Sequence, residues 1–404
     1  LFYILPTFFN SDLDRGFSII DYDLNDELVT LEDLDQLHEL NVMFKFDLVL
    51  NHTAKEHEWA RKARAGEGRY RDYYFMFPDD MLPKAYESTL VEIFPANAPG
   101  NFTYYPDMDR WVWTTFNSYQ WDLNYADPEV FNRMLEEMLF LANQGVEILR
   151  LDAVAFLWKR LGTNSQNLPE AHTIIQAFNA LVHIAAPAMV FKSEAIVHPD
   201  EVRKYIGEDE CQLSYNPQLM ALLWNSLATT KVRILKHGLQ RRFAIPPGCS
   251  WVNYVRCHDD IGFAFSNDDV SDLGMDPAAH RRFLTDFYTG GFAGSFARGM
   301  PFQEDRTTGE ARISGTCASL AGLEKALAED DAGAVELAIQ RILLIHGVIL
   351  TIGGIPLIYL GDEIATLNDD SYEEDPEKTG DSRWLHRGVF DWERAELRRD
   401  LDTV

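Results

Sequence analysis

The sequence is poor in three things: basic residues, suitably spaced cysteines and long apolar runs. Lysine and arginine number 36 against 64 acidic residues, which gives a net charge of −28. Nucleic acids and anionic membranes bind basic surfaces, so this balance argues against both as partners. A solvated acidic surface, such as proteins of salty habitats carry, accounts for the charge.

The few cysteines are not arranged to bind a metal or to form a redox motif. They are Cys211, Cys249, Cys257 and Cys317. None of them has a CxxC or zinc-type spacing. Cys257 precedes a candidate catalytic histidine, and we expect it to be a packed, unreactive thiol.

Apolar runs are also short. A membrane-spanning helix needs roughly 18 or more apolar residues, and no run approaches that length. The longest candidate, Ile342–Leu360, is interrupted by His346, Gly353, Gly354 and Pro356. This pattern predicts a buried helix followed by a strand.

A buried strand with charged residues at its end is the most informative segment that is present. Residues Gly145–Val154 are apolar and β-prone, yet they contain Arg150 and Asp152. Because they lie two residues apart, these two side chains point to the same side of a strand. A carboxylate beside a fixed cation suits a nucleophile, since the cation keeps the acid ionised. A structural ion pair that closes the strand end is the alternative.

Other segments share this pattern and favour the catalytic interpretation. Each is an apolar run that ends in His, Asp or Glu: Phe46–His52, Val190–Ala195 and Trp251–Asp260. The carboxyl ends of parallel strands meet at one face of an α/β barrel, so we expect these polar residues to share a pocket. The residues concerned are His52, Asp152, Glu194, His258 and Asp259.

Alternating strand and helix patterns predict the fold. Strands are expected at residues 1–9, 43–52, 145–154, 188–195, 212–216, 251–259 and 356–361. Helical patterns lie between them, for instance at Pro128–Asn143 and Leu168–His183. The repeated order of strand and helix is typical of a parallel (β/α)8 TIM barrel of the α/β class.

The strand-end residues, in this order, resemble the four signature regions of the α-amylase superfamily (glycoside hydrolase family 13). Further motifs resemble the amylosucrases within that superfamily: Glu56–Ala60, Trp111–Ser118, Lys192–Pro199 and Ser295–Gly299. The resemblance covers nearly the whole chain.

The resemblance implies a domain organisation. Residues 1–52 and 126–404 would form the catalytic barrel, residues 53–125 an inserted domain, and residues 261–325 a loop subdomain after the seventh strand. The chain begins at what resembles the second barrel strand, and it lacks the helical region and the β-sandwich that flank the barrel in amylosucrases. We therefore expect a partial sequence without the first strand. The second helix, expected at Asp33–Asn41, is about one turn shorter than usual.

The resemblance also assigns catalytic roles. Asp152 would be the nucleophile, Glu194 the general acid/base and Asp259 the carboxylate that stabilises the transition state. Retaining enzymes hold the first two carboxyl groups roughly 5–5.5 Å apart. Arg150 would orient Asp152, and a neighbouring carboxylate would raise the pKa of Glu194.

Sugar-binding roles follow in the same way. His52 and His258 match histidines that hold the glucosyl ring, and Phe17 and Phe116 match aromatics that pack on it. The remaining matches are Asp14 and Arg383, as a salt bridge behind one glucosyl unit, and Asp260 and Arg312, at the fructosyl ring. Val91 replaces an arginine on the acceptor side of amylosucrases.

These assignments predict a retaining glucosyltransferase that cleaves sucrose, releases fructose and extends an α-1,4-glucan. A sucrose hydrolase is the alternative, followed by a non-catalytic carbohydrate-binding relative, which would be expected to lose a catalytic carboxylate. Relatives often bind calcium near Asn51, but the resemblance implies neither a metal nor a cofactor. We expect sucrose and an α-glucan acceptor as partners, and a cytoplasmic location, with secretion left open because a signal peptide would precede Leu1.

Overall fold

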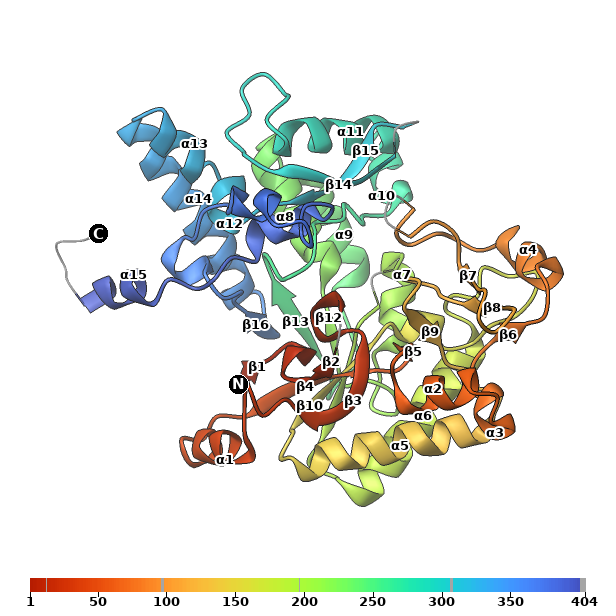
Figure 1. Cartoon of the computed structure of the whole chain (residues 1–404). Helices are drawn as coiled ribbons and strands as arrows, with labels where there is room; N and C mark the ends of the chain where they lie inside the picture. Colours follow the sequence, from red (N-terminus) through yellow and green to blue (C-terminus); the bar gives the residue numbers. More distant parts are fainter. Residues whose placement is uncertain (12, 96–97, 196, 306–307, 400–404) are drawn as a thin grey trace. The chain divides into compact units, whose positions relative to one another are not determined.

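The computed structural model describes residues 1–11, 13–95, 98–195, 197–305 and 308–399 (Figure 1). The chain divides into two compact units. The first unit comprises Leu1–Val197, Lys204–Ser214 and Pro246–Cys249. The second unit comprises His198–Arg203, Tyr215–Ile245 and Ser250–Val404.

Parallel strands form the centre of the first unit. In spatial order they are β1 (Phe2–Tyr3), β4 (Phe44–Val49), β10 (Ile148–Asp152), β11 (Val190–Ser193) and β12 (Leu213–Tyr215), of which the last residue belongs to the second unit. All residues of β4 and β10 are buried, as expected for strands covered on both faces. The register sets Arg150 opposite Asp47 on one side and opposite Lys192 on the other. Asp47, Arg150 and Lys192 therefore lie side by side on adjacent strands.

Helices follow these strands, and three of them lie close to the helices predicted at Asp33–Asn41, Pro128–Asn143 and Leu168–His183. They are α1 (Leu31–Glu39), α5 (Pro128–Asn143), η3 (Val154–Phe156), α6 (Pro169–Ala185) and η4 (Arg203–Tyr205). Helix α5 begins with Asp127 as its N-cap and Pro128 in the first turn, an arrangement that satisfies an exposed backbone N–H and fixes φ. The short helix expected at Asp33–Asn41 is present but begins two residues earlier. Its start is set by a capping box between Thr30 and Asp33.

Two stretches of the first unit have a different, largely antiparallel structure. Near the N-terminus lie η1 (Pro6–Phe8), β2 (Phe9–Ser11), η2 (Asp14–Gly16) and β3 (Ile19–Leu24). Between β4 and α5 lie β5 (His52–Ala54), α2 (Glu58–Arg64), α3 (Gly68–Arg71), β6 (Met76–Phe77), α4 (Met81–Glu87), β7 (Phe102–Tyr105), β8 (Arg110–Trp113) and β9 (Gln120–Asp122). Strands β6, β8 and β7 form an antiparallel sheet, and β5 pairs with β9. This second stretch coincides with the predicted insertion at 53–125, although the domain boundary itself stays a prediction.

The second unit contains the parallel strands β13 (Ser250–Tyr254) and β16 (Ile355–Leu357). Its hairpin consists of β14 (Met300–Asp305) and β15 (Glu310–Ser314). Its helices are α7 (Pro199–Val202), α8 (Pro217–Thr229), α9 (Arg233–Arg242), α10 (Asn267–Ser271), α11 (Pro277–Tyr288), α12 (Cys317–Leu320), α13 (Leu323–Ala328), α14 (Ala332–Thr351), η5 (Asp362–Ile364), η6 (Asp370–Glu374), η7 (Ser382–His386), α15 (Trp392–Glu396) and η8 (Leu397–Arg399). Each segment that the sequence predicts as a barrel strand thus includes residues of one parallel strand in the structure.

Helix α14 corrects one prediction. By length and composition it is apolar enough to cross a membrane, and only 22% of its most apolar window is buried. Leu343 and Leu344 are exposed, so the prediction that this helix is buried is wrong for most of its length. The residue thought to interrupt the apolar run, His346, lies inside the helix, because a single histidine does not break helical hydrogen bonding.

Candidate active site

Arg150 holds two carboxylates at the centre of the first unit. Its Nη1 donates to Oδ1 of Asp152 at 2.6 Å and also to Oδ1 of Asp47 on the neighbouring strand. The side chains of Arg150 and Asp47 are 3% and 0% exposed, whereas that of Asp152 is 11% exposed. Asp152 is therefore the member of this ion-pair group that retains some access from outside.

The predicted acid/base residue lies beside the predicted nucleophile. Oε2 of Glu194 accepts the backbone N–H of Ala153 at 3.1 Å, one residue after Asp152. Ala153 has φ of 54°, a left-handed conformation that costs a non-glycine residue energy. The backbone N–H of Glu194 in turn donates to the carbonyl oxygen of Leu151 at 3.0 Å. These bonds bring the two carboxyl groups together at the ends of β10 and β11.

Burial controls the charge of Asp152. Loss of hydration raises the pKa of its carboxyl to about 8, with the Arg150 guanidinium lowering it and Glu194 and Asp47 raising it. The sequence predicts the opposite balance, with Arg150 keeping Asp152 ionised. Desolvation has the larger effect on the pKa of Asp152, since the charge of Arg150 is shared between Asp152 and Asp47. Burial thus favours the protonated form of Asp152 in the free protein, whereas the retaining mechanism requires this carboxyl to be ionised.

His52 and its neighbours form a second part of the site in the first unit. Burial lowers the pKa of His52 to about 4, so the imidazole is neutral at neutral pH. Its Nε2 lies 3.2 Å from the carbonyl oxygen of Phe17, which can only accept, so this nitrogen carries the proton. The ring of Phe116 lies 5.1 Å from the imidazole, and the ring of Phe17 lies 5.5 Å from the Arg150 guanidinium. The structure thus groups His52, Phe17 and Phe116 with the Arg150–Asp152 pair, and their role in binding sugar stays a prediction.

Asp14 is held by a residue that the sequence did not single out. Nε2 of Gln120 donates to Oδ2 of Asp14 at 3.1 Å and lies 3.2 Å from the Phe17 carbonyl oxygen. The backbone here is left-handed at Asp14, Arg15 and Gly16, with φ of 50°, 52° and 93°. A Cβ at Gly16 would lie 2.3 Å from the carbonyl carbon of Pro6, so only glycine fits.

A buried lysine is the second feature that sequence reasoning missed. Nζ of Lys159 donates to Oδ2 of Asp122 at 2.5 Å, to Oδ1 of Asn51 at 3.0 Å and to the Phe156 carbonyl at 2.7 Å. Asp122 also accepts the backbone N–H and the hydroxyl of Thr115. This network, the Lys159 anchor, joins the segment after β10 to β9 and to the end of β4. The Asn51 side-chain oxygen, where relatives often bind calcium, is here bonded to an ammonium group.

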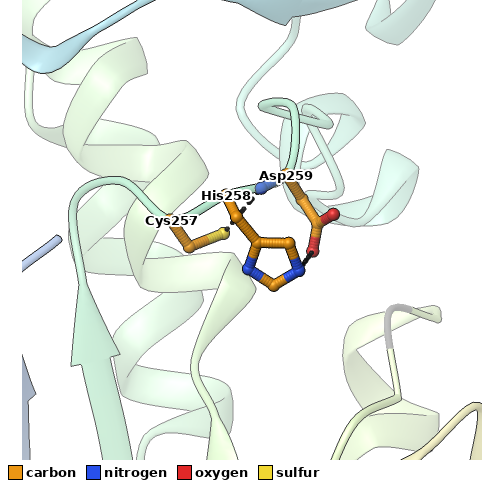
Figure 2. Close-up of side chains that lie close together, drawn as sticks. All are labelled: Cys257, His258 and Asp259. Atoms are coloured by element: carbon orange, nitrogen blue, oxygen red, sulfur yellow. Dashed lines mark hydrogen bonds and ion pairs between the residues drawn. The ribbon is translucent and has the colours of Figure 1, made fainter. Parts of the chain in front are cut away.

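His258 and Asp259 form the corresponding group in the second unit. Figure 2 shows them with Cys257 just beyond β13, and Nε2 of His258 lies 3.3 Å from Oδ2 of Asp259. Nη2 of Arg387 lies 3.6 Å from the other Asp259 oxygen. The Asp259 side chain is 40% exposed and that of His258 only 8%, so the carboxylate is the accessible member.

The last described segment of the chain fixes this group. Nε2 of His386 lies 3.1 Å from the His258 carbonyl oxygen, and Nε of Arg387 donates to the same oxygen. Nδ1 of His386 accepts the backbone N–H of Gly315 at 3.2 Å. Sequence reasoning missed His386 and Arg387, although they follow within the same short segment as the predicted Arg383.

Three further predicted residues lie in the second unit. Nε of Arg312 lies 3.8 Å from Oδ2 of Asp260, and burial raises the pKa of Asp260. Arg383 makes a bidentate ion pair with Asp381, at 2.9 and 2.8 Å, and its guanidinium lies 4.6 Å from the ring of Phe302. The predicted Asp14–Arg383 bridge joins residues of different units and stays a prediction.

Cys257, His258 and Asp259 have potential ligand atoms within 4.8 Å of one another. Burial raises the pKa of the Cys257 thiol to about 12. Asp259 already faces His258 and Arg387. This group is better suited to binding sugar hydroxyls than a metal.

Comparison with known proteins identifies the family. The sequence model "Alpha amylase, catalytic domain" matches residues 1–260. The chain belongs to the α-amylase family. Trehalose synthase from Pimelobacter sp. is 31% identical over 285 residues, covering 66% of this chain and 49% of that protein. Glucosylglycerate phosphorylase from Spirochaeta thermophila is 29% identical over 409 residues, covering 100% of this chain and 64% of that protein.

Solved structures confirm the predicted TIM-barrel fold class. Sucrose 6F-phosphate phosphorylase from Thermoanaerobacter thermosaccharolyticum has a TM-score of 0.79 at 20% identity, covering 98% of this chain and 76% of that one. A trehalulose synthase from Pseudomonas mesoacidophila has a TM-score of 0.61 at 20% identity, covering 93% and 61%. The chain spans about half to two thirds of the length of the curated relatives named above.

Proposed function

We propose that this α-amylase family protein is a retaining glucosyltransferase that takes sucrose as its glucosyl donor. The observation that carries the proposal is the pair of carboxyl groups, Asp152 and Glu194, at the ends of adjacent strands beside Arg150. A retaining enzyme needs one ionised and one protonated carboxyl on either side of the bond that breaks.

The reaction has two steps. Carboxylate Asp152 attacks the anomeric carbon of the glucosyl unit while Glu194 donates a proton to the leaving fructose oxygen. The product of this step is a β-glucosyl ester on Asp152. Glu194, now ionised, then removes a proton from the incoming acceptor, which attacks the same carbon and restores the α configuration. By resemblance, His52, Phe17 and Phe116 would bind the glucosyl ring.

Sucrose as the donor rests on the amylosucrase-like motifs, among them Trp111–Ser118 and Lys192–Pro199, of which Ile196 lies outside the described residues. These motifs do not determine which acceptor receives the glucosyl unit. A glucan end would make the protein an amylosucrase, and water would make it a hydrolase. Val91, which is 54% exposed, stands where amylosucrases have an arginine on the acceptor side.

A specific observation favours phosphate as a second candidate acceptor. The relative that matches 100% of this chain is named glucosylglycerate phosphorylase. A phosphorylase uses the same two carboxyl groups but has phosphate attack the glucosyl ester. The product would then be α-glucose 1-phosphate.

One experiment separates these acceptors. The protein is incubated with sucrose alone, with sucrose plus glycogen, and with sucrose plus inorganic phosphate, and free fructose, free glucose and glucose 1-phosphate are quantified over time. Fructose in excess of glucose supports transfer to sugar, equal amounts mean hydrolysis, and glucose 1-phosphate that depends on phosphate means phosphorolysis. No fructose under any condition, with trehalose and glucosylglycerate cleaved instead, would overturn sucrose as the donor.

A further inference from the structure

The second unit contains another group of side chains of types that can bind a metal. None of them belongs to the candidate active site described above. The group consists of Cys317 at the start of α12, His346 within α14 and Asp362 at the start of η5. One ligand atom from each of these residues lies within 4.8 Å of the other two. Cys317 is 1% exposed, and the side chains of Asp362 and His346 are 4% and 13% exposed.

The polar atoms of this group point toward one another. Nε2 of His346 lies 3.4 Å from Oδ2 of Asp362, and neither atom makes a hydrogen bond within the described part of the chain. Buried polar atoms in native proteins are almost always hydrogen-bonded, so two that lack a hydrogen bond in the described part of the chain call for a ligand or another explanation.

The histidine is oriented as a ligand. Its Nδ1 lies 2.9 Å from the carbonyl oxygen of Ile342, one turn earlier in α14, and therefore carries the ring proton. In the neutral imidazole the lone pair is then on Nε2, which faces Asp362. Metal-binding histidines commonly donate their other N–H to a carbonyl or carboxylate in this way.

The charges of the group suit a divalent cation. A thiolate and a carboxylate would together neutralise two positive charges. Burial raises the pKa of both Cys317 and Asp362, the Arg256 guanidinium lowers both, and a bound divalent cation would itself displace the thiol proton. Sulfur, nitrogen and oxygen ligands in one tetrahedral set are characteristic of zinc, whose ligand atoms lie roughly 3.3–3.8 Å apart. Small side-chain movements would bring these atoms to that spacing.

We propose that Cys317, His346 and Asp362 bind one Zn²⁺ ion that ties α12, α14 and the turn η5 together. Binding would release the thiol proton of Cys317 to solvent, and a water molecule would complete the fourth position. The ion would link segments far apart in the sequence and act on the stability of the second unit. It would take no part in sugar chemistry.

The test uses the full chain, stripped of metal and titrated with Zn²⁺ in competition with a chromophoric chelator. We expect one tight site per chain, weakened at least about 100-fold in Cys317→Ser and in His346→Gln. Cys257→Ser and Cys211→Ser are the matched controls, because they remove a thiol outside the group, and both should bind like the wild type. Thermal melting of each variant checks that it is folded.

A measurement on the wild type alone keeps the proposal testable if those variants fail to fold. Co²⁺ in place of Zn²⁺ should give a thiolate-to-cobalt charge-transfer band in the near ultraviolet, with the intense visible bands of a tetrahedral site. Absence of that band, or one lost in Cys257→Ser but kept in Cys317→Ser, would overturn the proposal. So would a wild-type affinity equal to that of Cys317→Ser, because the group would then be only a His346–Asp362 ion pair beside a packed thiol.

Discussion

A single nitrogen of Arg150 serves two carboxylates, and this division sets the electrostatics of the site. Asp47 is fully buried and pairs with the same Nη1 that orients Asp152. The cation is therefore only partly available to the nucleophile, and burial is able to raise the pKa of Asp152. Asp47 touches no substrate in the proposed mechanism, but it adjusts the residue that does.

The nucleophile assignment gives the first prediction. Asp152→Asn removes the attacking oxygen and should lower the rate of fructose release from sucrose by about four orders of magnitude, with the fold retained. Fructose is measured by a coupled assay, and circular dichroism checks the fold. Asp26→Asn, the same change at an exposed site, is the control and should keep wild-type activity. Turnover near the wild-type rate in Asp152→Asn would refute the mechanism.

The second prediction concerns pH. The nucleophile must be ionised, so kcat/KM should fall as the pH drops below the pKa of Asp152, which burial places at about 8 in the free protein. Asp47 raises that pKa, so Asp47→Asn should shift the acid limb of the profile to lower pH.

The profile is measured with α-glucosyl fluoride, whose leaving group needs no protonation, so that titration of the general acid does not interfere. Temperatures well below the melting point of the variant are required, because breaking a buried pair costs about 3–5 kcal/mol. An unchanged acid limb, or one moved to higher pH, would contradict the role given to Asp47.

At the scale of secondary structure, the strand ends were predictable and the loops between them were not. Arg150 and Asp152 lie on a strand and Glu194 directly follows one, and the apolar patterns of these strands predict where each strand ends. Gln120, Lys159 and Arg387 belong to segments without periodicity, and they reach the site only through tertiary contacts. The exposed helix α14 was mispredicted for a related reason, since an apolar pattern indicates a helix but not what covers it.

The Lys159 anchor gives a prediction about elements. Lys159→Met leaves the buried carboxylate of Asp122 without its cation and should destabilise the protein by about 3–5 kcal/mol. The double variant Lys159→Met/Asp122→Asn removes both charges and should recover part of that loss. Chemical denaturation measures both. Lys62→Met is the control, because Lys62 makes an exposed pair with Glu58 worth about 0–1 kcal/mol.

If the single and double variants are equally unstable, packing of the lysine stem and not charge would hold these segments together. If Lys159→Met alone is as stable as the wild type, the anchor has no structural role.

For the whole molecule, the dominant property is its charge. A net charge of −28 makes the folded chain repel itself, and salt screens that repulsion. We expect Tm to rise by several degrees between about 10 mM and about 500 mM NaCl, where the Debye length falls from about 30 Å to below about 8 Å. Differential scanning fluorimetry measures this, with KCl as the check that screening and not a specific ion is responsible. A Tm that falls with salt would mean that attractive ion pairs outweigh the repulsion.

The fold of the whole chain followed from the sequence more securely than its chemistry did. Strand spacing and strand-end residues pointed to the α-amylase barrel, and the family match over residues 1–260 agrees. The choice among water, glucan and phosphate depends on acceptor-side residues such as Val91. These residues lie on loops, where the sequence pattern carries little information about position.

The cation of the Lys159 anchor is part of the polypeptide. A dissociable ion in that place would be subject to mass action, and its occupancy would follow the supply in the surroundings. The lysine ammonium has instead an effective concentration set by the backbone, independent of dilution or of competing chelators. The Lys159 anchor is therefore complete as soon as the chain has folded, without the binding of an ion.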